Sequence, residues 1–147
     1  MKISDFLSRA DTLVDVRASD KEGLLQDLAQ KAATRLALSA NTILSELLKR
    51  EGLGSTGMGN GVAIPHARFQ SLKKPFSIIA RLKQPIDFQA IDDQPVDIVF
   101  VLLLPATSEG EQLGALACAA RKLREASELA KLRKAKNASD LYRDLSA

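Results

Sequence analysis

Residues 50–68 read REGLGSTGMGNGVAIPHAR. This stretch holds five of the eight glycines in the chain and its one histidine, His66. Glycine permits positive φ angles and lets backbone N–H groups approach a ligand closely. Successive N–H groups of this kind, those of Gly57 and Gly59 included, can form a nest that binds an anion. The stretch therefore predicts a glycine loop that holds an anionic group beside an imidazole.

Two hydroxyls and two arginines surround these glycines. Ser55 and Thr56 supply further hydrogen-bond donors, and the guanidinium fork of Arg50 matches phosphoryl oxygens. Arg68 adds a second fixed positive charge. With an ordinary pKa of about 6.5, the imidazole of His66 is mostly neutral near pH 7 and keeps a lone pair that can attack phosphorus. These residues favour phosphoryl transfer, although a lone histidine is more often structural than catalytic.

Other phosphate and metal motifs do not fit. No Gly-Lys-Ser/Thr ending follows the glycines, which excludes a P-loop. Val62 stands where a dinucleotide fingerprint requires its third glycine, and the loop follows a predicted helix, not a strand. One histidine and one cysteine cannot supply the usual nitrogen and sulfur ligands of a metal site. We therefore expect neither a metal nor a cofactor.

The size of the chain suits one domain. It has 147 residues, of which 46% are hydrophobic, so residues 1–147 can form one domain with a largely aliphatic core. No apolar run is long enough to cross a membrane, and the N-terminus lacks an apolar signal core. The single cysteine, Cys118, excludes an internal disulfide and suits a reducing compartment. We expect a cytoplasmic protein without membrane insertion.

The charge balance points away from nucleic acid. The formal net charge is only +3, from 21 basic and 18 acidic residues. Much of the basic excess lies late in the chain, at Arg121, Lys122, Arg124, Lys131, Arg133, Lys134 and Lys136. This pattern is typical of a solvated helix face, because a nucleic-acid surface would need more basic residues with aromatic residues among them.

Hydrophobic periodicity predicts alternating strands and helices. Strands are expected at residues 12–16, 62–64, 76–82 and 96–104. Pro65 ends the short second strand and places His66 at a strand-to-loop boundary. The alternation over 76–82 indicates a half-exposed strand, whereas the continuous apolar run 96–104 indicates a central strand covered on both faces.

Helix signals separate these strands. Ser19, with Glu22 three places later, predicts a capping box for a first helix, and Ser39 predicts the cap of a second helix that Gly52 ends. Three further helices are expected around residues 113–123, around 129–132 and after a cap at Ser139. Together these patterns predict a three-layer α/β/α sandwich. The hairpin-length connection between 82 and 96 predicts a mixed sheet.

Two motifs resemble a known family. The run GSTGMGNGVAIPHAR (54–68) and the stretch IDFQAIDDQPVDIVF (86–100), with LLLPA after a further residue, resemble the EIIA domains of the bacterial phosphotransferase system. The resemblance is to the mannitol/fructose-type EIIA fold and, within it, to the nitrogen-regulatory branch. It implies that His66, after the Ile-Pro pair, accepts a phosphoryl group and that Arg50 is the family's arginine before the glycines. It also implies a phosphohistidine carrier in place of a multiple-turnover enzyme.

The resemblance further implies partners. An HPr-like phosphocarrier would be the donor, and the regulated targets would be proteins such as potassium transporters or sensor kinases. Relatives often carry a second histidine at the position of Gln112, whose amide donates a hydrogen bond but carries no charge. Two alternatives stay open: a sugar-specific EIIA that passes phosphate to an EIIB domain, and a regulator that binds its targets without phosphorylation.

Overall fold

The computed structural model describes residues 1–106 and 109–147, and only the backbone of 109–113. The helical elements are the short 3-10 turns η1 (Ile3–Asp5) and η2 (Arg9–Asp11) and the α-helices α1 (Lys21–Leu36), α2 (Ala40–Gly52), α3 (Glu109–Arg124), α4 (Ala126–Lys134) and α5 (Ala138–Ser146). The strands are β1 (Thr12–Val16), β2 (Gly57–Gly59), β3 (Val62–Ala63), β4 (His66–Phe69), β5 (Phe76–Ile86) and β6 (Val96–Pro105). The expected strand 12–16 is confirmed.

The described strands form one mixed sheet. Their order is β1-β5-β6-β3-β2, and β4 also pairs with β6. The pairs β1–β5, β3–β6 and β4–β6 are parallel, whereas β5–β6 and β2–β3 are antiparallel. The antiparallel hairpin from β5 to β6 confirms the mixed sheet that its short connection predicted.

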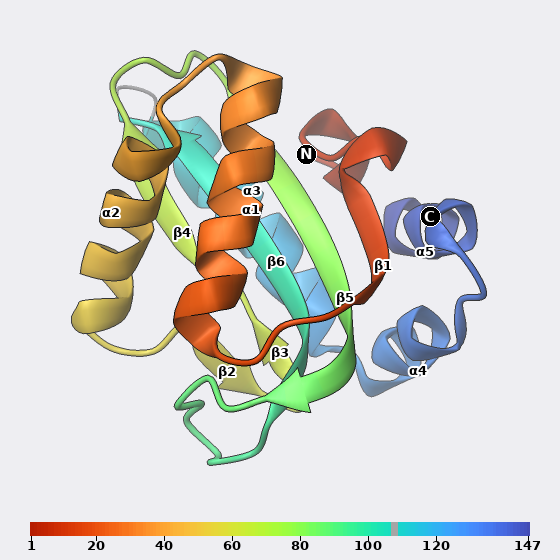
Figure 1. Ribbon diagram of the computed structural model, residues 1–147. Coiled ribbons are helices and arrows are strands. Elements are labelled where there is room, and N and C mark those ends of the chain that lie inside the picture. The colour runs from red at the N-terminus through yellow and green to blue at the C-terminus, as the bar shows by residue number, and fades with distance from the viewer. Residues whose placement is uncertain (107–108) are drawn as a thin grey trace.

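Helices cover both faces of the sheet, as Figure 1 shows with α1 and α2 in front and α3 behind. Side chains of β6 alternate between two cores: Val101 and Leu103 pack in the core that includes α1 and α2 residues, and Phe100 and Leu102 in the core that includes α3, α4 and α5 residues. Apolar area is thus removed from water on both faces of the strand. The three-layer α/β/α architecture and the doubly covered central strand are confirmed.

The expected half-exposed character of residues 76–82 is wrong. The strand β5 lies inside the sheet between β1 and β6, and the side chain of Ser77 is fully buried. The Ser77 hydroxyl donates a hydrogen bond to the carbonyl of Phe6 at 2.7 Å. Arg81 Nη1 donates to the carbonyls of Leu132, at 2.9 Å, and Ala135, at 2.6 Å. The alternating polar residues therefore bond to the helices and turns that cover the strand, and not to water. An alternating sequence pattern looks the same in both cases.

Two of the three expected helix caps are also wrong. Asp20, not Ser19, caps α1 by accepting the Gly23 N–H at 2.7 Å, and Asn137, not Ser139, caps α5. The Ser139 hydroxyl instead accepts a hydrogen bond from Arg9 Nε at 2.8 Å. Ser, Asp and Asn are about equally good caps, so the position where the chain enters each helix decides among them. Ser39 does cap α2, and this helix ends at Gly52.

Candidate functional site

His66 lies at a break in an edge of the sheet. The strands β3 and β4 both run parallel to β6, with Ala63 opposite Val99 and His66 opposite Leu102. Pro65 interrupts them because it has no N–H for the ladder. Its carbonyl nevertheless accepts the Leu102 N–H at 2.8 Å. From the sequence we expected His66 at the boundary between a strand and a following loop. The loop is wrong, since His66 is the first residue of the strand β4.

The imidazole of His66 is half-buried and held by one hydrogen bond. Its Nδ1 lies 2.8 Å from the carbonyl oxygen of Ile64. A carbonyl only accepts, so this geometry assigns the proton to Nδ1 and leaves the lone pair on Nε2. Burial lowers the pKa of His66, and the nearby charges of Arg50 and Arg68 lower it further, against the Ile64 hydrogen bond and Glu51, which raise it. The neutral imidazole is therefore the form favoured near pH 7.

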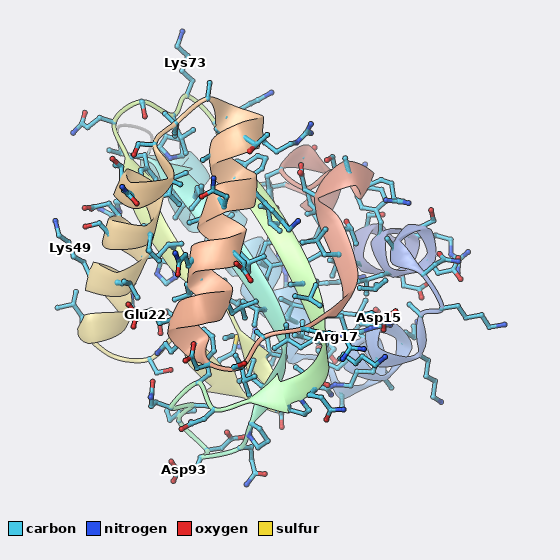
Figure 2. The ribbon with its side chains drawn as sticks, viewed as in Figure 1. Asp15, Arg17, Glu22, Lys49, Lys73 and Asp93 are labelled. Atoms are coloured by element: carbon cyan, nitrogen blue, oxygen red, sulfur yellow. The ribbon has the colours of Figure 1, made fainter. Side chains whose placement is uncertain are left out.

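The two arginines flank this imidazole from different elements. Arg50 lies in the last turn of α2, and its Nη1 donates to the carbonyl of Gly54 at 2.7 Å, just beyond the helix end. Arg68 is exposed on β4, two residues after His66. Both line one surface depression with His66 and Leu53. Lys49, one residue before Arg50, projects from α2 away from the sheet (Figure 2) and also borders this depression. Glu46 also lines the depression and pairs with Lys49 at 3.1 Å, so the two arginines are what make it positively charged beside the imidazole.

The glycine stretch is a β-hairpin and not the open loop that the sequence suggested. The strands β2 and β3 pair across Asn60 and Gly61, whose φ angles are 59° and 80°. Positive φ at both central residues defines a type I′ turn, for which Asn-Gly is the preferred pair. A Cβ at Gly57 would lie 2.8 Å from the backbone of Ala90, so this glycine allows a close chain approach. Gly59 has φ +98° within β2.

The hydroxyls expected at a phosphate already have protein partners. Ser55 Oγ donates to the carbonyl of Phe88 at 2.6 Å and accepts the Gly57 N–H at 3.0 Å. Thr56 donates both its N–H, at 3.1 Å, and its hydroxyl to the carboxylate of Glu51. Ser55, Thr56 and Gly57 thus lie at the site but are bonded within the protein. Glu51 is a site residue that sequence reasoning missed, although its place directly after Arg50 was a usable signal.

Apolar side chains surround the other side of His66. A second depression is lined by Met58, Ile64, His66, Ile91 and Leu116, with Arg50 at its border. Ile91 is 83% exposed, and Leu53 near the first depression is 86% exposed. Large apolar side chains this exposed around a histidine are typical of a surface that a protein partner covers. The sequence gives no sign of Leu53 or Ile91 as surface residues of the site, because an isolated leucine or isoleucine in a loop carries no periodic signal.

Gln112 belongs to α3 by its backbone, but its side chain lies outside the described residues.

Within the described ranges, no group of three or more His, Cys, Asp or Glu side chains is arranged to hold a metal ion. In the same part of the chain, no helix is both long and apolar enough to span a membrane. Cys118 is buried, with its sulfur 3.4 Å from the carbonyl oxygen of Met1.

Known proteins are similar to this chain in sequence. Residues 5–147 match the family model described as "Phosphoenolpyruvate-dependent sugar phosphotransferase system, EIIA 2". A nitrogen regulatory protein of Bradyrhizobium diazoefficiens is 42% identical over 142 residues, which cover 97% of this chain and 93% of that protein. A fructose-specific EIIA component of Haloferax volcanii is 36% identical over 104 residues, or 70% of this chain and 68% of its own.

A solved structure agrees over the same length. The crystal structure of the nitrogen regulatory protein IIA-Ntr from Neisseria meningitidis superposes with a TM-score of 0.92 at 31% identity, covering 97% of this chain and 98% of that one. The mixed sheet between two helical layers is therefore that of an EIIA-type phosphotransferase protein. The chain belongs to the EIIA 2 family of the phosphoenolpyruvate-dependent sugar phosphotransferase system. Within that family it is similar to nitrogen regulatory proteins over nearly its whole length.

Proposed function

We propose that the protein is a phosphocarrier that accepts a phosphoryl group on Nε2 of His66 from an HPr-like protein. The observation that carries this proposal is the 2.8 Å contact between Nδ1 and the Ile64 carbonyl, which leaves Nε2 as the nitrogen with the lone pair. The lowered pKa of His66 keeps that lone pair available near neutral pH. The family membership of the chain supports the same chemistry.

The transfer step is a displacement at phosphorus. Nε2 of His66 attacks the phosphorus of the donor's phosphohistidine, a new N–P bond forms, and the donor imidazole leaves with the electron pair of the old bond. The proton on Nδ1 stays on the ring, bonded to Ile64. Catalysis of such a step depends mainly on alignment and on stabilising the phosphoryl oxygens. The exposed Ile91 and the half-buried Met58 line a depression with His66, and this apolar surface supports a docked protein donor.

Several residues would hold the phosphoryl group. Arg50 uses Nη1 on the Gly54 carbonyl, and we propose that the rest of its guanidinium contacts phosphoryl oxygens. Arg68 adds positive charge from β4. Ser55, Thr56, Gly57 and Gly59 would shape the rim of the site. We also propose that the amide of Gln112 donates a hydrogen bond to the bound phosphoryl group, so that Gln112→Ala would shorten the lifetime of the phosphorylated form.

The proposed role is regulation. The similarity to nitrogen regulatory proteins supports a protein whose phosphorylation state reports nitrogen and carbon status to targets such as potassium transporters or sensor kinases. The second candidate is sugar transport, with transfer from His66 to an EIIB domain. The 36% identity to a fructose-specific EIIA component supports sugar transport as this second candidate. The buried Cys118 thiol is compatible with the reducing cytoplasm, where we expect this relay to operate.

The test is intact-mass measurement after incubation with phosphoenolpyruvate, enzyme I and the HPr-like carrier of the same cell. We expect a single acid-labile phosphoryl adduct on the wild type and none on His66→Ala. An adduct that persists in His66→Ala would place the acceptor elsewhere. No adduct on the wild type, with a donor shown to be phosphorylated, would overturn the phosphocarrier and favour regulation by binding alone. Passage of the phosphoryl group from the adduct to an added EIIB domain would favour sugar transport.

A further inference from the structure

A largely buried ion pair lies beside the start of the glycine hairpin. Lys21, the first residue of α1, places its Nζ 2.7 Å from Oε1 of Glu51 near the end of α2, and the two side chains are only 15% and 5% exposed. Figure 1 shows the start of α1 and the end of α2 at the same end of the sheet, near β2 and β3. The ammonium also lies 3.1 Å from Oε1 of Gln89 and 4.7 Å from the centre of the Phe88 ring. Both charges therefore have partners in a site with little water.

Glu51 also fixes the entry to the hairpin. Its Oε1 accepts the backbone N–H of Thr56 at 3.1 Å, and its Oε2 accepts the Thr56 hydroxyl. Thr56 is buried, so water cannot easily replace the carboxylate as its acceptor. The carboxylate thus holds Thr56 by its backbone and its side chain at once, while Lys21 holds the carboxylate.

Two further hydrogen bonds continue from Thr56 to the imidazole. The Thr56 carbonyl accepts the Ile64 N–H at 3.1 Å, across the hairpin. The Ile64 carbonyl, at the other side of the same residue, accepts Nδ1–H of His66 at 2.8 Å. Lys21, Glu51, Thr56, Ile64 and His66 are therefore connected by one unbroken series of polar contacts. The last contact decides which imidazole nitrogen carries the proton.

We infer that Glu51 is the positioning residue for His66: through Thr56 and Ile64 it holds the carbonyl that keeps the proton on Nδ1 and the lone pair on Nε2. Free neutral histidine in water favours the opposite tautomer, with the proton on Nε2, so the protein must supply this preference. The consequence of the inference for phosphoryl transfer rests on the proposed function of His66. The role of Glu51 in setting the tautomer of His66 is independent of that function.

The experiment is nitrogen NMR of protein labelled with ¹⁵N-histidine, recorded above the pKa of His66. Since His66 is the one histidine in the chain, its two ring nitrogens give the only imidazole signals. In the wild type we expect a protonated Nδ1 and an unprotonated Nε2. In Glu51→Gln the side chain keeps one acceptor oxygen for three donors, so we expect the Nδ1–H form to fall from the majority to a minority. The rate of phosphorylation by the HPr-like donor should fall about tenfold or more.

Two further variants keep the test decisive. If Glu51→Gln alone does not fold, because Lys21 is left buried without its partner, Lys21→Met combined with Glu51→Gln removes both charges and should show the same tautomer change. The matched control is Glu128→Gln on α4, which breaks a half-buried pair of similar kind, with Lys122 at 3.5 Å, in the layer on the other face of the sheet. It should leave the tautomer and the rate unchanged.

The outcomes separate this inference from the proposed function. An unchanged Nδ1–H tautomer in folded Glu51→Gln and in the double variant would overturn the positioning role, whatever happens to the rate. The same would hold if Glu128→Gln changed the tautomer as much as Glu51→Gln. A tautomer that shifts as expected, in a protein whose wild type never accepts phosphate, would support the positioning role and overturn the phosphocarrier.

Discussion

Arg133 of α4 forms a bidentate ion pair with Asp97 of β6, with Nη2 2.9 Å from Oδ1 and Nε 3.1 Å from Oδ2. The same Nη2 donates to the carbonyl of Asn60 at the tip of the glycine hairpin, at 2.6 Å. A Cβ on the neighbouring Gly61 would lie 2.5 Å from this guanidinium, so only glycine leaves room for the contact. A helix from the far end of the chain therefore anchors the hairpin that borders His66.

Removing this fork should loosen the hairpin. For Arg133→Gln we expect a loss of about 1 kcal/mol in the free energy of unfolding, because a partly exposed bidentate pair and one backbone hydrogen bond are lost. Urea unfolding measures the loss, and hydrogen exchange at the N–H groups of β2 should become faster. Arg143→Gln, which breaks two partly exposed pairs within α5, with Asp140 and Asp144, serves as the control. Equal effects of the two substitutions would contradict an anchoring role for Arg133.

Two glycines of the stretch should respond oppositely to alanine. In Gly57→Ala the new Cβ would lie 2.8 Å from the Cα and Cβ of Ala90, and the backbone on one side cannot yield cheaply. We expect a loss of about 2–3 kcal/mol in the free energy of unfolding, as for other overpacked sites. Gly52→Ala meets nothing within 4 Å at the end of α2. It should be neutral or stabilise by up to about 1 kcal/mol. Thermal or urea unfolding distinguishes the two, and equal losses would contradict the close contact.

The pH dependence of phosphorylation should report the lowered pKa of His66. Burial and the two arginines favour the neutral imidazole, so the rate should stay level through pH 7 and fall only below the ordinary histidine pKa of about 6.5. For the same reason the contribution of His66 to the free energy of unfolding is present above that pKa and is lost as the pH falls. Arg68→Gln removes a positive neighbour and should raise the pKa of His66. NMR titration of the single histidine measures this shift, and a pKa that stays or falls in Arg68→Gln would contradict it.

Arg50 should not be replaceable by lysine. Lysine keeps the positive charge but loses the planar fork that can hold the Gly54 carbonyl and a phosphoryl oxygen together. We expect the phosphorylation rate of Arg50→Lys to fall about 10-fold to 100-fold, corresponding to about 1.4–2.7 kcal/mol in the barrier. Rapid-quench kinetics with the HPr-like donor measures the change. A rate equal to that of the wild type would show that charge alone is sufficient.

The sequence by itself determined the layers and singled out the residue at the centre of the candidate site. Clustered β-branched residues identified β1, and a continuous apolar run identified the doubly covered β6. Apolar residues at helical spacing identified the helices between the strands, since burial on one face imposes a period of 3.6 on a helix. The Ile-Pro-His motif singled out His66, because no other residue offers an imidazole. The prediction that Ser39 caps α2 was correct because this cap is a local interaction: the Ser39 side chain accepts a backbone N–H only three residues later.

Only the tertiary structure decided what the groups around His66 bind. The alternation in β5 looked like solvent exposure, yet Ser77 and Arg81 bond carbonyls from segments far along the chain. The glycine stretch looked like an open anion-binding loop, but β2 pairs with β3 to make it a hairpin. The donors of Ser55 and Thr56 just before this hairpin are bonded to Phe88 and Glu51. Hydrogen-bond partners distant in sequence leave no local pattern in it, so these assignments required the folded chain.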